Sequence, residues 1–217
     1  MITIVDYGAG NIRSISNMLR ALGIASKITG EAAEVAAAER LILPGVGHFD
    51  HGMGELSRRG VVTALGETVA RGVPLLGICL GAQLLTRGSE EGSAAGLGFI
   101  AAETIGFDCA RLGPTLKVPH IGWSDVWAVR ENPLLATDDD EARFYHVHSF
   151  HIRCDEPASE FLHAHHGYDF VTGIGAGPVL GVQFHPEKSH RFGMALLSRF
   201  AAWSPGRWLT APARSAA

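Results

Sequence analysis

The sequence predicts an α/β fold with a mostly parallel central sheet, flanked by helices and continued by an antiparallel extension in the C-terminal half. In the first 90 residues, short apolar runs alternate with segments of helical spacing, which is typical of right-handed crossovers in a parallel sheet. Between residues 97 and 184, short strand-like segments are separated by turn residues, which favours antiparallel strands. A chain of 217 residues with 47% hydrophobic content can bury one sizeable core. We therefore expect one domain over residues 1–203 and a loose tail over residues 204–217.

Short apolar runs indicate the buried strands of the parallel part, and apolar residues three and four positions apart indicate its helices. In chain order we expect a strand at 2–5, a helix at 11–22, a strand at 40–43, a helix at 61–70, a strand at 73–78 and a helix at 80–87. Because ligands of open α/β sheets bind outside the carboxyl ends of the strands, the end of the 73–78 strand is the expected place of a site.

The second half is expected to contain strands at 142–147, 160–165 and 179–184, followed by a helix at 191–202. The glycine-rich segment 173–177 lies before Pro178 and leads into the last of these strands, so we interpret it as a hairpin turn. Beyond Ser204 the sequence has no periodicity, although Trp208 could dock on the domain.

Charge and hydropathy exclude several classes of function. The net charge is −4 and no basic cluster is present, so we expect neither a nucleic-acid nor a membrane partner. The longest apolar stretches, such as 73–80, are too short to span a bilayer, and the N-terminus lacks an export signal, which predicts a cytoplasmic protein. The three cysteines form no disulfide-like or metal-like set, and we expect Cys109 and Cys154 to be buried structural residues.

Cys79 is the central residue of a Gly-x-Cys-x-Gly motif between the expected strand and helix. This is the pattern of a nucleophile elbow, in which flanking glycines let neighbouring backbone pass close to a sharp turn. At a helix N-terminus, unpaired N–H groups favour the thiolate, and the N–H of Leu80 can face a developing oxyanion. The alternative is a buried cysteine that only fills the core.

The segment His185-Pro186-Glu187 follows the expected strand at 179–184 and supplies a base with its orienting partner. A cysteine nucleophile needs an imidazole to take and return its proton, and the imidazole needs an acceptor that fixes its tautomer. In an extended chain, a two-residue spacing would put His185 and Glu187 on one side. The alternative is a surface turn, because the segment is rich in turn formers.

Two further patterns are weaker. Gly8-Ala9-Gly10 is similar to a dinucleotide-binding turn, but Arg13 occupies the third glycine position. Among the eleven histidines, His146 and His148 share one face of an expected strand. Without a matched cysteine or carboxylate set, we expect no metal site and interpret the histidines as surface or supporting residues.

Taken together with Pro44-Gly45-Val46-Gly47, the cysteine and histidine motifs resemble those of class I, or triad-type, glutamine amidotransferases. Within that class, three segments resemble the glutaminase subunit of imidazole glycerol phosphate synthase: 6–11 (DYGAGN), 118–123 (VPHIGW) and 145–150 (YHVHSF). The likeness extends from about residue 2 to residue 200, and the motifs occur in family order. The resemblance implies a single class I glutamine amidotransferase domain that needs no cofactor.

The resemblance also implies roles for individual residues. It assigns the catalytic triad to Cys79, His185 and Glu187, and the oxyanion hole to Val46, Gly47 and Leu80. It assigns glutamine binding to Gln83, Glu91, Ser149 and Phe150, and the partner interface to Asn11, Pro119, Trp123 and Lys188. A carboxylate suits the ammonium group of glutamine, but without the resemblance Glu91 would be interpreted as a solvated charge.

The implied activity is hydrolysis of glutamine to glutamate and ammonia, with ammonia channelled to a (β/α)8 cyclase subunit in histidine biosynthesis. Four positions depart from the family pattern, namely Ala82, Ser124, His146 and Phe150, where Met, Asn, Phe and Tyr are usual. Segments 86–92, 150–154 and 192–194 also resemble paralogues that supply ammonia for surface-sugar amidation. That activity, a noncatalytic scaffold subunit and a metallohydrolase remain the alternatives.

Overall fold

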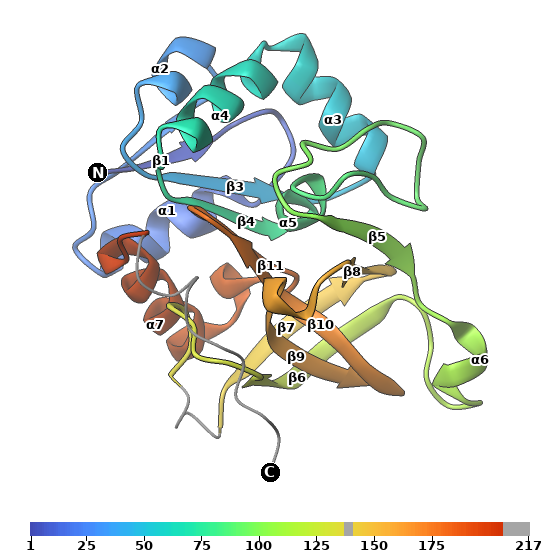
Figure 1. Ribbon diagram of the computed structural model, residues 1–217. Helices are drawn as coiled ribbons and strands as arrows, with labels where there is room; N and C mark the ends of the chain where they lie inside the picture. Colours follow the sequence, from blue (N-terminus) through green and yellow to red (C-terminus); the bar gives the residue numbers. More distant parts are fainter. Residues whose placement is uncertain (137–140, 206–217) are drawn as a thin grey trace.

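The structure is a computed structural model that describes residues 1–136 and 141–205 (Figure 1). It contains a large mixed sheet with helices on both faces of its parallel part. The mostly parallel centre and the antiparallel extension are both confirmed. The expected tail lies almost wholly outside the described residues, as does Trp208.

The parallel part of the sheet has the order β2-β1-β3-β4-β11, and every neighbouring pair in it is parallel. Its strands are β1 (Ile2–Val5), β2 (Ser26–Thr29), β3 (Leu41–Gly45), β4 (Leu75–Cys79) and β11 (Val179–Val182). All residues of β1, β3, β4 and β11 are buried, as expected where helices cover both faces of a parallel sheet.

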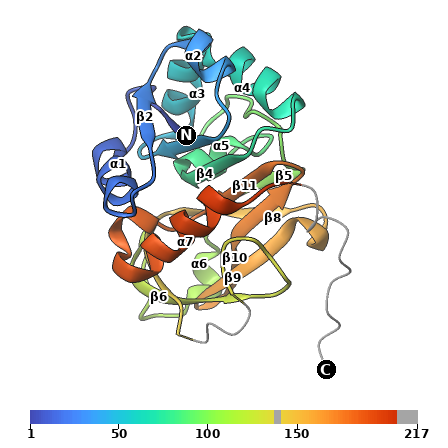
Figure 2. The same ribbon diagram turned by 90° about the vertical axis from the view of Figure 1, so that its left-hand side faces the viewer.

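Two hydrophobic cores lie on opposite faces of these strands. Since successive side chains of a strand point to opposite faces, Ile4 packs in one core and Val5 in the other. The first core includes α1 (Ile12–Ala21) and α7 (His190–Ala202), which lie side by side (Figure 2). The second includes α2 (Ala32–Ala36), α3 (Phe49–Arg58), α4 (Val61–Ala70) and α5 (Leu80–Leu84).

The antiparallel extension continues from β11 in the order β10-β9-β6-β7, and β8 pairs both with β10 and with β5. The strands are β5 (Ala102–Gly106), β6 (His120–Ala128), β7 (Arg143–His148), β8 (Phe150–Cys154), β9 (Glu160–His166) and β10 (Tyr168–Ala176). Short helices complete the fold at α6 (Cys109–Leu112), η1 (Pro157–Ser159) and η2 (Pro186–Lys188).

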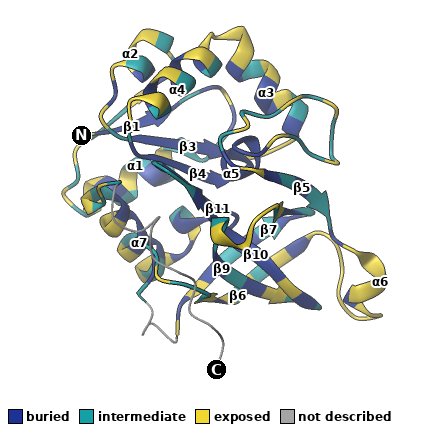
Figure 3. Ribbon diagram, viewed as in Figure 1, coloured by how far each residue is buried: buried dark blue, intermediate teal, exposed yellow. Residues whose placement is uncertain are grey.

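A hairpin does connect β10 and β11, but the expected turn at 173–177 is mostly wrong, because residues 173–176 belong to β10 and the turn is formed by Gly177 and Pro178. The expectation for Cys109 is wrong, because this residue begins the exposed helix α6 (Figure 3). Cys154 is half-buried. His146 and His148 are not surface residues, since both side chains are buried where β7 packs in the second half of the sheet.

Among residues 1–136 and 141–205, no helix is both long and apolar enough to cross a membrane.

Candidate active site

Cys79 lies at the carboxyl end of β4, where the chain turns directly into α5. Its backbone has φ 55° and ψ −114°, outside the usual regions for a residue with a side chain. Such strained backbone is concentrated at functional sites, and this strand-to-helix turn has the form of a nucleophile elbow. The side chain is 6% exposed and lines a cavity of about 370 Å³.

Both glycines of the elbow motif are required by close backbone contacts. A Cβ on Gly77 would lie 2.7 Å from the Gly81 carbonyl oxygen. A Cβ on Gly81 would lie 1.8 Å from the carbonyl oxygen of Leu43 on the neighbouring strand β3. The elbow therefore forms only because neither residue carries a side chain.

His185 and Glu187 lie beside the elbow, both with side chains only 1% exposed. His185 Nδ1 is 2.8 Å from Glu187 Oε1, so the proton on Nδ1 is donated to the carboxylate. The geometric reason given from the sequence is wrong, because Pro186–Lys188 forms a 3-10 turn, not an extended segment. The tight turn still brings the carboxylate back to the ring.

The free nitrogen of His185 is available for chemistry. Nε2 is buried and has no hydrogen-bond partner among the described residues. Burial alone would lower the pKa of His185, but the neighbouring Cys79 and Glu187 side chains outweigh burial and raise the pKa above its usual value. An imidazolium next to a thiolate is the arrangement that a cysteine nucleophile requires.

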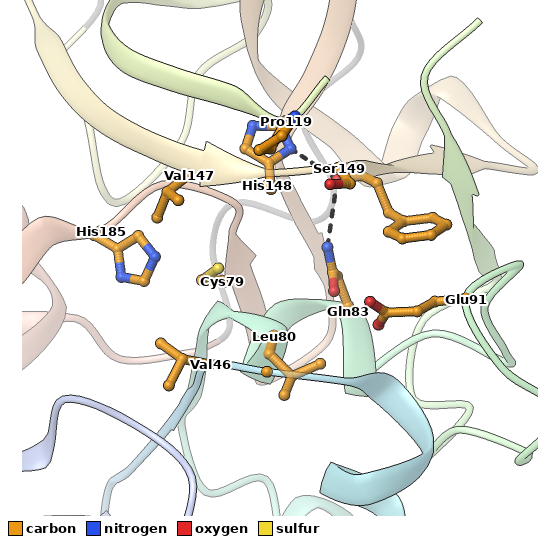
Figure 4. A pocket seen from close by; sticks show the side chains of 12 residues that line it. Val46, Cys79, Leu80, Gln83, Glu91, Pro119, Val147, His148, Ser149 and His185 are labelled. Carbon is orange, nitrogen blue, oxygen red and sulfur yellow. Dashed lines mark hydrogen bonds between the residues drawn. The ribbon is translucent and has the colours of Figure 1, made fainter. Parts of the chain in front are cut away.

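The residues expected to form the oxyanion hole lie at the same cavity (Figure 4). Leu80 is the first residue of α5, so its N–H has no acceptor within the helix. Val46 and Gly47 follow β3, and Gly47 has φ 107°, a conformation that strongly favours glycine. Gly45 pairs with Cys79 in the β3–β4 register, which places this segment directly beside the nucleophile.

The four residues expected to bind glutamine, namely Gln83, Glu91, Ser149 and Phe150, all line the cavity. Gln83 Nε2 donates to the Phe150 carbonyl oxygen at 3.3 Å (Figure 4). Glu91 Oε2 accepts from the Phe49 N–H at 2.8 Å, which fixes one carboxylate oxygen. Glu91 is thus a half-buried cavity residue, not a freely solvated charge.

The residues expected at a partner interface are spread over neighbouring elements. Pro119 lines the same cavity as Cys79, after a cis peptide bond from Val118. Asn11 immediately precedes α1, Lys188 ends η2 and Trp123 lies on β6. Helix α1 packs on η2, η2 on β7, and β7 pairs with β6, so these elements form a continuous series.

Sequence reasoning missed several residues that shape the cavity. His148 and Val147 line it, while Asp50 holds the loop that carries Glu91, because its carboxylate accepts from the Ser93 and Ala94 N–H groups at 2.9–3.0 Å. These hydrogen bonds lower the pKa of Asp50. No local motif marks such contacts, since the partners lie more than 40 residues apart in the chain.

The described histidines are not arranged as a metal site. Within the part of the chain that the structure describes, no group of three or more His, Cys, Asp or Glu side chains could hold a metal ion. Instead, His120 stacks on His146 and on His166 with ring centroids 4.9 and 4.2 Å apart.

Comparison with known proteins agrees with the geometry. A sequence model of the class-I glutamine amidotransferase family matches residues 3–202. Imidazole glycerol phosphate synthase subunit HisH 2 of Methanococcus maripaludis is 43% identical over 92% of this chain and 98% of its own length. HisH 2 of Pseudomonas aeruginosa is 42% identical over 92% of this chain and 98% of its own length. HisH 1 of the same organism is 39% identical over 95% of this chain and 98% of its own length.

Solved structures show the same fold at lower sequence similarity. PurLQS from Thermotoga maritima superposes with a TM-score of 0.71 at 17% identity, covering 93% of this chain and 96% of that one. A crystal structure of a glutamine amidotransferase superposes with a TM-score of 0.68 at 20% identity, covering 93% of this chain and 97% of that one. With the elbow, the His185–Glu187 pair and the match over nearly the whole chain, this protein belongs to the class-I glutamine amidotransferases and, among them, to the HisH family.

Proposed function

We propose that this chain is the glutaminase subunit of an imidazole glycerol phosphate synthase, with Cys79, His185 and Glu187 as its catalytic triad. The observation that carries the proposal is that Cys79 and His185 line one cavity, while Glu187 is hydrogen-bonded to His185. Gln83 and Glu91 line the same cavity, which suits the amino-acid end of glutamine. The domain would comprise residues 1–203, in line with the family match, and would act in the cytoplasm.

In the first half of the reaction, the Cys79 thiolate attacks the side-chain amide carbon of glutamine. A tetrahedral oxyanion forms and is stabilised by the Leu80 N–H and by peptide N–H groups of the Val46–Gly47 segment. His185 then gives the proton on Nε2 to the leaving nitrogen, the C–N bond breaks and ammonia departs. A γ-glutamyl thioester on Cys79 remains.

In the second half, His185 takes a proton from water as the water attacks the thioester carbon. The collapse of the second tetrahedral oxyanion breaks the C–S bond and releases glutamate. Glu187 holds Nδ1 protonated throughout, so Nε2 always faces the reaction. Each step uses groups of this chain and water.

The proposed partner is a (β/α)8 cyclase subunit that receives the ammonia. Exposed apolar side chains support an interface along β6 and the segment before it, where Val118, Ile121 and Trp123 are 37%, 60% and 40% exposed. Trp123 also stacks on His190, with ring centroids 5.7 Å apart and planes at 3°. Contiguous exposed apolar residues of this kind are typical of protein interfaces.

An ammonia acceptor in surface-sugar amidation remains the second candidate. Pseudomonas aeruginosa has two HisH proteins, and this chain is 42% and 39% identical to them. The similar identity to both copies keeps a second acceptor as the alternative.

The test is release of glutamate from glutamine by the subunit alone, with its cognate cyclase, and with cyclase plus the ribonucleotide substrate. We expect stimulation of about tenfold or more in the full system, because synthase and glutaminase sites of such complexes are coupled. Cys79→Ala should abolish glutamate release in all three conditions. Absence of turnover in every condition would contradict the proposal and direct the search to another acceptor.

A further inference from the structure

Gln183 is a fully buried amide beside the nucleophile, and the triad leaves it without a role. It follows β11, and its backbone N–H donates to the Thr172 carbonyl oxygen at 2.9 Å. Its side chain is 0% exposed and links two groups of the cavity. Oε1 accepts from Gln83 Nε2 at 3.1 Å, and Nε2 donates to Cys79 Sγ at 3.8 Å.

The direction of this amide chain is determined at both ends. The Phe150 carbonyl oxygen can only accept, so the Gln83 amide must present its NH2 group there. The same NH2 group then donates to Gln183 Oε1, which leaves Gln183 Nε2 facing the sulfur. Turning the Gln83 amide around would set its oxygen against two other carbonyl oxygens. Turning the Gln183 amide around would oppose two NH2 groups and set a carbonyl oxygen against the sulfur. The assignment of N and O therefore follows from the network.

A second chain of hydrogen bonds fixes the same carbonyl. His148 Nδ1 lies 2.7 Å from the Phe150 oxygen, so the proton must be on Nδ1 (Figure 4). His148 Nε2 consequently accepts from His120 Nδ1 at 3.3 Å. Burial lowers the pKa of both histidines, which keeps the rings neutral and each in one tautomer. The Phe150 oxygen is thus held by two donors, and the Gln83 amide has a rigid anchor.

We propose that Gln183 is a positioning residue of the glutaminase: its amide N–H holds the Cys79 thiolate by a charge-assisted hydrogen bond. The Gln183 amide is oriented for this bond by Gln83, which is itself anchored on the Phe150 carbonyl oxygen. An N–H donor stabilises the thiolate over the thiol, and it also fixes the side chain of Cys79 for attack. Because Gln83 uses both N–H groups inside the protein, only its oxygen remains for glutamine. Substrate binding and nucleophile orientation are therefore linked through one pair of amides. The inference rests on the proposed function only in naming glutamine as the substrate.

The test is the rate of Cys79 alkylation by iodoacetamide in the isolated subunit, measured from pH 5 to 10. Cys79→Ala identifies the signal from Cys109 and Cys154. In Gln183→Leu we expect the rate at neutral pH to fall about tenfold and the midpoint of the pH profile to move up by about one unit, because a hydrogen bond to a charged group is lost. Gln183→Glu should move the midpoint further, since it sets a carboxylate against the sulfur.

Thr172→Val is the matched control. Thr172 is buried nearby, and its side chain is hydrogen-bonded to His146, not to Cys79. This variant should keep the wild-type alkylation profile, which separates loss of the donor from general loss of buried polar groups. If Gln183→Leu does not fold, Gln183→Met takes its place, as it retains the length of the side chain.

An unchanged midpoint in a folded Gln183 variant would overturn the inference, whatever its glutaminase activity. The assay needs neither partner nor nucleotide, so this outcome is distinguishable from failure of the proposed function. An equal shift in Thr172→Val would also overturn it, because the effect would then be one of packing.

Discussion

Tyr7 is 0% exposed, and its buried hydroxyl has no hydrogen-bond partner among the described residues. It lies beside the oxyanion segment, where a Cβ on Gly45 would come within 2.5 Å of it. Burial, with the nearby charge of Cys79, raises the pKa of Tyr7 above its usual value and keeps the phenol neutral. An unsatisfied buried hydroxyl destabilises the folded state.

Tyr7→Phe should therefore leave the free energy of unfolding unchanged or raise it by about 1 kcal/mol. Tyr168→Phe is the matched comparison, because the Tyr168 hydroxyl accepts from the Asp108 N–H at 3.0 Å and lies 3.1 Å from His151 Nε2. Its loss should lower the free energy of unfolding by about 1–2 kcal/mol. Urea unfolding of the isolated subunit measures both. A clear loss of stability in Tyr7→Phe would show that the hydroxyl has a partner.

At the scale of residues, sequence motifs predicted those parts of the site whose residues are close together both in the sequence and in space. Cys79 with Leu80, and His185 with Glu187, are such cases, because each pair is fixed by one tight turn. Gln183 lies in the same motif as His185, but its role depends on a residue 100 positions earlier. Nothing in the local pattern indicates that contact.

At the scale of elements, some bounds match the sequence-based expectations and others do not, and glycines account for part of the difference. Helix α4 has the expected bounds, whereas α5 ends at Leu84 and the Arg87 N–H donates to the Ala102 carbonyl oxygen instead. Strand β10 was not expected, because Gly173 and Gly175 suggested only a turn. A Cβ on Gly173 would lie 2.7 Å from Leu162 Cβ, so glycine there serves the close approach of β9.

Helix α3 was also missed, and two glycines in its sequence are the reason. Gly52 faces Leu84, where a Cβ would come within 3.2 Å of the leucine side chain. Packing against α5 therefore stabilises α3 as a helix although the helix propensity of its sequence is low. Gly54 in the same helix is exposed and has nothing within 4 Å of a Cβ position.

The same substitution should therefore have opposite effects in two helices. Gly54→Ala should raise the free energy of unfolding by about 0.5–1 kcal/mol, because alanine loses less conformational entropy in a helix. Gly81→Ala in α5 should lower it by about 3 kcal/mol or more, since the added Cβ would lie 1.8 Å from the Leu43 carbonyl oxygen. Urea unfolding measures both variants. Equal effects of the two would contradict the elbow geometry.

At the scale of the whole molecule, the two halves of the sheet differ in how their interiors respond to acid. The parallel half buries almost only apolar side chains. The antiparallel half buries four histidines, His120, His146, His148 and His151, around the aromatic rings of Phe107 and Phe170. Burial lowers the pKa of each, to about 4 for His120 and about 3 for His146.

The sign of the pH effect follows from these shifts. In the unfolded chain the histidines titrate near pH 6.5, while in the folded protein His120 and His146 stay neutral down to about pH 4 and 3. Between these limits the unfolded chain binds more protons, so the free energy of unfolding falls as the pH falls. Each such histidine contributes a slope of up to about 1.4 kcal/mol per pH unit.

His146→Phe should reduce that slope by up to about 1.4 kcal/mol per pH unit, the contribution of one proton, because it removes one of the buried bases. His146 packs against Phe170 and Phe184, with ring centroids 5.9 and 5.7 Å away, so a phenyl ring suits the site. Urea unfolding between pH 6.5 and 4.5 measures the slope. Thr172→Val removes the hydrogen bond between Thr172 and His146 but leaves the histidine in place, and it should keep the wild-type slope. A slope unchanged in His146→Phe would mean that His146 takes up its proton without unfolding, and the acid sensitivity would then belong to other groups of the cluster.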